Sequence, residues 1–120
     1  MKRRAESVAV LAVAAIFATL GQQSVARAAP APEVEYTYDV VVRRHYDFPN
    51  NDAIGYGFGI CGKVRGGESY PQIMGEVKTD VTPNDEFAAN YLVSYAVGIL
   101  CPAQIWQLRH SAAGYVPPSG

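Results

Sequence analysis

Apolar side chains recur at helical spacing in four stretches of the chain, and each stretch predicts an amphipathic helix. The first begins at Glu35, after a Pro/Ala-rich stretch, residues 29–34, that is typical of a disordered leader. Its apolar face, three or four positions apart, is expected to hold Tyr38, Val41, Val42 and His45. Pro49 and the polar residues 50–52 end this helix and offer an N-cap for the next one.

The second stretch, residues 53–64, aligns four apolar residues on one stripe: Ile54, Phe58, Cys61 and Val64. It also contains glycine at positions 55, 57, 59 and 62, and each glycine costs about 1 kcal/mol relative to alanine inside a helix. A glycine-rich strand or loop is therefore the competing interpretation. If a helix forms, glycines at alternate positions allow a neighbouring helix to approach closely.

The third and fourth stretches carry start and stop signals. Ser69 and Gln72 have the spacing of a capping box, and the apolar positions that follow are Ile73, Met74, Val77 and Val81. Thr82 as N-cap and Pro83 at the first helical position predict the start of the fourth helix. Its broad apolar face is expected to hold Phe87, Tyr91, Leu92, Tyr95, Ile99 and Leu100.

These patterns together predict an all-α fold, a small bundle of about four helices over residues 35–102. Pro102 ends the fourth helix. In the remaining residues, 103–120, we expect one short helix up to His110 and then a frayed tail.

The N-terminus has the order of parts found in secretory signals. Basic residues 2–4 precede an uncharged run, residues 7–20, and Ala26-Arg27-Ala28 supplies the small residues of a cleavage site. The alternative is an uncleaved membrane anchor, but the run falls short of the about 20 apolar residues that cross a bilayer. We therefore expect residues 1–28 to be a cleaved signal peptide and the protein to be secreted, outside the cell or in its envelope. Arg3-Arg4 leaves general and twin-arginine export both open.

Cleavage changes the charge of the chain. Residues 1–28 contain four of the ten basic residues and one of the eleven acidic residues, so the mature chain keeps six and ten, a net charge of −4. Nucleic acids and anionic membranes require a basic face, so the charge excludes both as expected partners, and no stable membrane span is expected after cleavage.

Both cysteines, Cys61 and Cys101, lie in the mature chain. An even number of cysteines in an exported protein indicates a disulfide, and a pair of free buried thiols is the alternative. Their separation, with His45 and His110 far from both in the sequence, lacks the close-paired spacing of a zinc site. We expect no metal and no cofactor.

No group of residues has the spacing of a catalytic site, so we expect no enzymatic activity. The Gly55–Gly59 run lacks the G-x-G-x-x-G spacing and the preceding strand of a dinucleotide-binding loop. Neither histidine is accompanied by a nucleophile motif. Acidic residues at helix starts, such as Asp85 and Glu86, have a structural reason to be there.

Tyrosine is unusually frequent, and all eight tyrosines lie in the mature part. Tyrosine combines a large contact area with one polar group, which suits binding surfaces, although tyrosines that surround a core would give the same composition. The candidate binding surface consists of Tyr91, Tyr95, Tyr56 and Trp106.

Residues 36–102 resemble the domain-of-unknown-function 732 family of small exported actinobacterial proteins. The resemblance rests on Gly59-Ile60-Cys61, a glycine-containing turn soon after, and the closing Ala96 and Cys101-Pro102. It implies a helical domain behind a signal peptide with its two cysteines paired, and it transfers no known activity. The chain departs from the family in its extra glycines and in the residues after Pro102.

The leading hypothesis is a secreted, non-enzymatic binding module that recognises a protein or a cell-wall component through a tyrosine-rich face. A carrier of a small apolar ligand is the second hypothesis, because the glycines could open a groove between helices. An enzyme that uses His45 or a carboxylate is the third.

Overall fold

The computed structural model describes residues 30–118; the predicted signal peptide lies outside the described residues. Every regular element in the described part is helical, which confirms the predicted all-α class. The elements in order are α2 (Pro32–Thr37), the π-helix η1 (Tyr38–Arg43), the 3-10 turn η2 (Pro49–Asn51), α3 (Ala53–Arg65), α4 (Tyr70–Asp80), α5 (Glu86–Tyr95), the π-helix η3 (Ala96–Leu100), the 3-10 turn η4 (Pro102–Gln104) and α6 (Ile105–Ser111).

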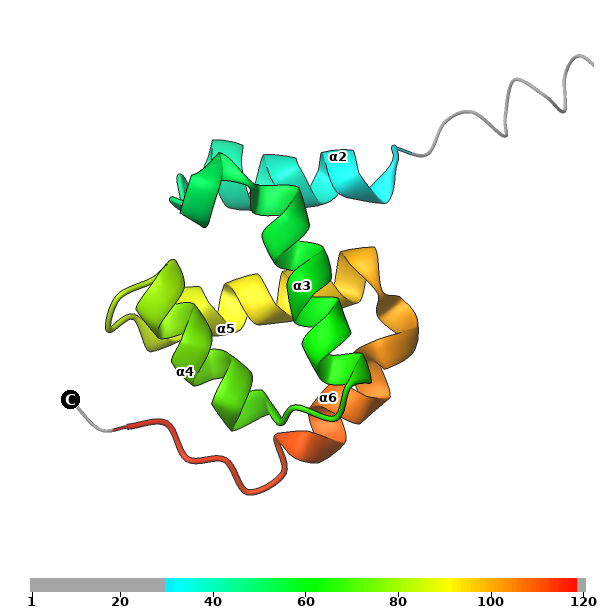
Figure 1. The fold of residues 1–120 in the computed structure, drawn as a ribbon, viewed down its shortest axis with the longest axis vertical. Coiled ribbons are helices and arrows are strands. Elements are labelled where there is room, and N and C mark those ends of the chain that lie inside the picture. The colour runs from blue at the N-terminus through cyan, green and yellow to red at the C-terminus, as the bar shows by residue number, and fades with distance from the viewer. Residues whose placement is uncertain (1–29, 119–120) are drawn as a thin grey trace, which may run out of the picture. The chain divides into compact units, whose positions relative to one another are not determined.

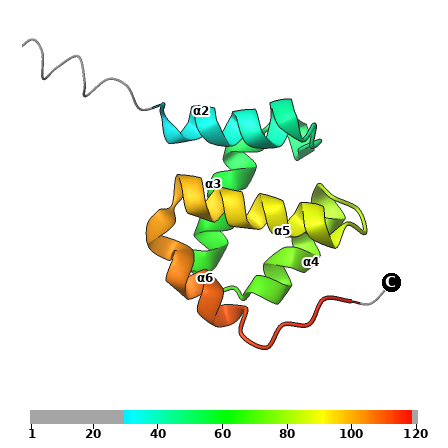
Figure 2. The same cartoon turned by 180° about the vertical axis from the view of Figure 1, so that it is seen from behind.

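The domain contains two composite helices, each made of an α-helix and a π-helix. α2 continues into η1 and α5 continues into η3, and the two composite helices run antiparallel (Figures 1 and 2). α3 crosses against η3, while α4 packs beside α5 and α6 packs against α3 and α4. One hydrophobic core joins these elements, and its fully buried side chains include Tyr36, Val40, Ile60, Val64, Ile73, Met74, Val77, Leu92, Val93 and Val97.

The first helix differs from its prediction in start and in orientation. It begins at Pro32 rather than Glu35, since proline is favoured in the first turn of a helix. Tyr36 and Val40 are its buried apolar residues, whereas the predicted inner face is exposed, at Tyr38, Val41, Val42 and His45. The helix is apolar on two sides, and the periodicity alone did not show which side faces the core.

α3 is a continuous helix, so the alternative of a glycine-rich strand or loop is wrong. The predicted stripe is partly wrong, because Ile54 and Phe58 are exposed while Cys61 and Val64 are buried. Gly57 takes the inward position instead. A Cβ at Gly57 would lie 2.7 Å from the ring of Tyr36 and 2.7 Å from Leu100, so glycine here permits the close approach of α2 and η3.

The third helix follows the sequence closely. In the capping box before α4, the Ser69 Oγ accepts a hydrogen bond from the Gln72 N–H at 3.4 Å, and the Ser69 N–H donates to the Gln72 Oε1 at 3.1 Å. The four predicted apolar positions, Ile73, Met74, Val77 and Val81, are all buried.

The fourth helix starts later than predicted and is rotated. Asp85, not Thr82, is the N-cap of α5, and its Oδ1 accepts a hydrogen bond from the Ala88 N–H at 3.0 Å. Of the predicted inner residues, Leu92 is buried but Phe87 is 89% exposed, and Tyr95 is also exposed. The buried positions are Ala89, Leu92, Val93, Ala96 and Val97. Small residues such as Ala89 and Ala96 thus form much of the buried face. The prediction from sequence was wrong here because it placed the large aromatic side chains Phe87 and Tyr95 on that face.

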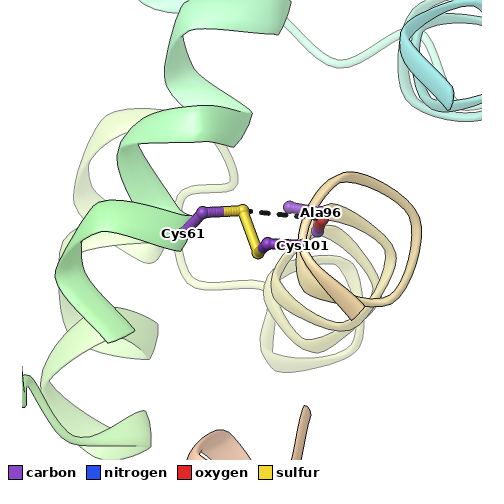
Figure 3. Close-up of a disulfide and its surroundings, with 3 residues drawn as sticks. All are labelled: Cys61, Ala96 and Cys101. Carbon is purple, nitrogen blue, oxygen red and sulfur yellow. Dashed lines mark hydrogen bonds between the residues drawn. A yellow bond between two sulfur atoms is a disulfide. The ribbon is translucent and has the colours of Figure 1, made fainter. Parts of the chain in front are cut away.

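The predicted disulfide between Cys61 and Cys101 is confirmed, with an S–S distance of 2.09 Å. It joins the middle of α3 to the residue that follows η3, as Figure 3 shows. The Cys61 Sγ lies 3.9 Å from the Ala96 carbonyl oxygen; a disulfide sulfur carries no proton to donate, so this is a packing contact.

In the described part of the C-terminal segment, for which a frayed tail was predicted, Tyr115 makes defined contacts with the bundle. After α6, the Tyr115 ring packs edge-on against Tyr70, with the ring centroids 5.1 Å apart. The Tyr115 hydroxyl donates a hydrogen bond to the Glu86 Oε2 at 2.9 Å. The tail therefore returns to the start of α5 and covers part of the helical bundle.

In the span from residue 30 to residue 118, no single helix has both the length and the apolar character needed to cross a membrane. Within this span, only the segments Glu86–Leu100 and Pro102–Ser111, taken together, have that length and apolar character, and they are bent by 118° relative to each other.

Candidate functional site

The three tyrosines of the candidate binding surface lie on two different helices, α5 and α3. Tyr91 and Tyr95 lie one turn apart on α5 with stacked rings, 4.0 Å between centroids and 18° between planes. Arg44 places its guanidinium 3.9 Å from the centroid of the Tyr91 ring, and the Tyr46 ring meets Tyr91 edge-on at 6.3 Å. These contacts join the end of η1 to α5, so the Tyr91 ring already takes part in packing within the domain.

Tyr56 lies on α3 and links this helix to the end of α4. Its hydroxyl donates a hydrogen bond to the Asp80 Oδ2 at 3.0 Å, and its ring tilts against Phe48 at 5.7 Å. Burial raises the pKa of Tyr56, and the hydrogen bond to Asp80 raises it further. Among the described residues, Tyr56 makes no ring contact with the stacked pair on α5.

Trp106, the fourth candidate, projects from α6 and is 67% exposed. The Arg109 guanidinium lies 5.3 Å from the centroid of its ring. Its neighbours Ile105 and Arg109 line a pocket that sequence reasoning did not identify.

This pocket lies between α5, α6 and the tail and has a volume of about 430 Å³. It is lined by Tyr70, Asn90, Ser94, Val97, Gly98, Ile105, Leu108, Arg109, Ala112 and Tyr115. A second pocket of about 330 Å³ shares Tyr70, Asn90 and Tyr115 with it and extends to Glu86, Phe87 and Pro117. We refer to the two together as the α5–α6 groove; α5, α6 and the tail can be followed in Figure 2.

Polar groups are distributed along the α5–α6 groove. The Asn90 Oδ1 accepts hydrogen bonds from the Tyr70 hydroxyl at 2.7 Å and from the Ser94 hydroxyl at 3.4 Å. The Asn90 side-chain NH₂, which can donate two hydrogen bonds, makes none with the described residues. It can therefore donate to a ligand that enters the groove.

The two ends of the α5–α6 groove differ in charge. Arg109 lies at the α6 end, and no described carboxylate comes within ion-pair distance of it. Glu86, at the other end, accepts hydrogen bonds from the Lys78 ammonium at 2.6 Å and from Tyr115. Burial alone would raise the pKa of Glu86, but the hydrogen bonds from Lys78 and Tyr115 outweigh it and lower the pKa. Burial, assisted by the Glu86 charge, raises the pKa of Tyr70 to about 12.

A groove of this kind has the groups needed to bind a polypeptide segment. Its floor is apolar, at Val97, Ile105 and Leu108, and its sides offer directional hydrogen-bonding groups. The sequence contained one signal for it: Asn90, Ser94 and Gly98 recur every four residues on one side of the composite helix α5–η3. Small polar residues at that spacing resemble an ordinary solvated face, so the signal was not distinctive.

Of the histidines and acidic residues considered for catalysis, Glu86 lines the α5–α6 groove and the others lie elsewhere. His45 is exposed, at the end of the first helix, and His110 is exposed on α6. Asp85 caps α5, and Asp39 lies 4.0 Å from Arg43. Within residues 30–118, no three His, Cys, Asp or Glu side chains are grouped closely enough to hold a metal ion.

Comparison with known proteins gives a family and no activity. A family model described as a protein of unknown function (DUF732) matches residues 35–103, from α2 to η4. No curated protein and no solved structure matches the chain. The matched residues include both cysteines and all of α3, α4 and α5, whereas α6 and the tail lie beyond them. The chain belongs to the DUF732 family of proteins of unknown function.

Proposed function

We propose that this protein is an exported, non-enzymatic binding module that receives an extended segment of a partner protein in the α5–α6 groove. The observation that carries the proposal is the groove itself: two adjoining pockets that share Tyr70, Asn90 and Tyr115. They combine an apolar floor with hydrogen-bonding groups along the sides.

The length of the groove suits a short extended segment. Along the composite helix α5–η3 it runs from Glu86 to Gly98, which corresponds to roughly 18 Å at the rise of an α-helix. An extended chain advances about 3.3 Å per residue, so about five residues would fill this length. Arg109 at one end offers an ion pair to an acidic side chain or a terminal carboxylate.

Exposed aromatic side chains give the groove its expected anchors. Phe87, which lines it, is 89% exposed, and Trp106 next to its α6 end is 67% exposed. Aromatic residues and arginine provide much of the binding energy in protein interfaces. The candidate Trp106 thus belongs to this proposal, whereas Tyr91, Tyr95 and Tyr56 act within the domain as packing residues.

Export is the second part of the proposal. It is supported by the signal-peptide pattern of residues 1–28 and by the disulfide, a bond typical of oxidising compartments. We place the mature protein outside the cell or in the envelope, where a protein or a cell-wall component would be its partner. The net charge of −4 after cleavage argues against nucleic acid.

The test uses two glycines at which a side chain meets open space. A Cβ at Gly98, in the groove, or at Gly59, on α3, finds no atom within 4 Å. Peptides selected from a random display library against the mature protein would be titrated against Gly98→Leu and Gly59→Leu. We expect Gly98→Leu to weaken binding by about tenfold or more, the equivalent of about 1.4 kcal/mol, and Gly59→Leu to leave it unchanged. Equal affinity for both variants would refute the proposal.

A small apolar ligand is the second candidate, because the larger of the two groove pockets, about 430 Å³, has the size of a small-molecule site. Native mass spectrometry of protein purified from culture medium distinguishes the two. A bound mass that is present in Gly59→Leu and absent in Gly98→Leu would favour the carrier. The bare polypeptide mass, together with peptide binding, would favour the protein segment.

A further inference from the structure

The composite helix α2–η1 is apolar on two opposite sides. Its inner side holds Tyr36 and Val40, which are fully buried. Its outer side carries Val34, Tyr38 and Val42, which are 62%, 53% and 54% exposed. A surface helix normally carries one apolar stripe, which faces the core, and polar residues opposite it. The second apolar side, which we call the α2 outer face, therefore has the composition of a covered surface.

Charged residues line one flank of the α2 outer face in a definite order. Glu35, Asp39 and Arg43 follow one another at four-residue spacing, which puts them on one side of the helix. Glu35 is exposed, Asp39 is buried against the domain, and the Arg43 side chain is 61% exposed. The accessible charge on this flank is therefore negative near the start of the helix and positive near its end.

This order is complementary to itself when two helices run antiparallel. In a two-fold symmetric contact, if residue i of one copy contacts residue j of the other, then residue j of the first copy also contacts residue i of the second. Val34 and Val42 are equally far from Tyr38 in the sequence, so an axis at Tyr38 brings Val34 of each copy to Val42 of the other. In the same arrangement Glu35 of each copy lies two positions from the point directly opposite Arg43 of the other, which the long arginine side chain can span.

We propose that a second copy of this chain covers the α2 outer face, in an antiparallel pairing centred on Tyr38. The self-complementary charge distribution selects this partner. An anionic membrane surface favours an amphipathic helix with a basic polar face, and acidic Glu33 and Glu35 oppose that here.

The pairing is a reversible one. A contact made by one helix from each copy is small, below the about 1,200 Å² that stable interfaces bury, so monomer and dimer are expected to interconvert with concentration. The inference is independent of the proposed function, because the α2 outer face and the α5–α6 groove share no residue.

Analytical ultracentrifugation of the mature protein over a range of concentrations tests the pairing. We expect the average mass to rise from monomer to dimer, and Val42→Glu to remain monomeric at every concentration. Phe58→Glu is the matched control and should leave the dimer intact, because it places the same charge on an exposed apolar position of α3, 43% exposed, outside both the α2 outer face and the groove. Circular dichroism shows whether each variant is folded. A monomeric wild type, or a dimer that persists in Val42→Glu, overturns the proposal.

Charge exchange tests the antiparallel order. Glu35→Arg and Arg43→Glu should each weaken dimerisation by about tenfold, since each replaces two attractive contacts with two repulsive ones. An equimolar mixture of the two variants restores opposite charges at both contacts and should recover the wild-type affinity as a heterodimer. A mixture that dimerises no better than either variant alone contradicts the antiparallel pairing.

Discussion

Gly57 is the residue on which the packing of three elements depends. A Cβ there would come within 2.7 Å of both Tyr36 and Leu100, and Tyr36 has no room to move, since it is fully buried and its hydroxyl donates to the Ala53 carbonyl at 3.0 Å. Gly57 therefore has a steric reason to be glycine, whereas a Cβ at Gly59 or Gly62 in the same helix would meet no atom within 4 Å.

We predict that Gly57→Ala lowers the free energy of unfolding by about 1–3 kcal/mol, the usual effect of overpacking. Gly59→Ala in the same helix should raise it by up to about 1 kcal/mol, because alanine favours the helix and no atom lies within 4 Å of the new Cβ. Urea unfolding followed by circular dichroism measures both. Equal effects of the two substitutions would show that Gly57 does not control the packing of α2 and η3.

Buried tyrosines make the stability depend on alkaline pH. Burial raises the pKa of Tyr36, Tyr56 and Tyr70 in the folded state, whereas in the unfolded chain these hydroxyls ionise near pH 10. Unfolding above that pH releases protons. The stabilising effect is therefore present below pH of about 10 and is lost as the pH rises toward the folded-state values.

We predict that the urea midpoint falls as the pH rises from about 9 to about 11. Tyr36→Phe should reduce the slope of this fall even if it lowers the stability at neutral pH, because one of the protons is no longer released. A midpoint that does not change over this range, or a slope unaffected by Tyr36→Phe, would contradict the role of the buried hydroxyls.

Among the elements, α3 and η3 are held together by a covalent bond as well as by packing. The disulfide of Cys61 and Cys101 closes a loop with a sequence separation of 40, which in the chain-entropy model stabilises the fold by about 4 kcal/mol. We predict that the double substitution to serine lowers the free energy of unfolding by about that amount, measured by urea denaturation. A loss below about 1 kcal/mol would mean that packing alone keeps these two elements together.

The elements also show how far sequence patterns reach. The position and cap of α4 were predictable, because Ser69 and Gln72 define the start and one apolar stripe continues to Val81. The orientation of α2–η1 was not, because Tyr36 with Val40 and Tyr38 with Val42 form two apolar sides of one helix. The choice between them depends on Gly57, which belongs to a different element.

The groove was beyond prediction for a related reason. Asn90 and Ser94 on α5 are ordinary polar residues until α6 and Tyr115 are placed opposite them, and the sequence predicted a frayed tail there. Tyr91 and Tyr95, selected for their aromatic character, instead stack on each other, and Tyr91 also contacts Arg44. Composition identified aromatic residues but not which of them pack internally.

At the scale of the whole molecule, α5 separates two surfaces with different expected roles. On one side, Arg44 and Tyr46 join α5 to the helix that carries the α2 outer face. On the other side, α5 forms one wall of the α5–α6 groove. A copy paired through α2 would therefore leave each groove free, so that one dimer could bind two partner segments.

The most direct test of the central claim is nuclear magnetic resonance of the isotope-labelled mature protein, titrated with a peptide selected by display. We predict that the amide shifts change at residues that line the groove, with the largest changes near Asn90, Gly98 and Ala112. Shift changes confined to the neighbourhood of Tyr56 and the Tyr91–Tyr95 pair, with the groove amides unaffected, would contradict the claim.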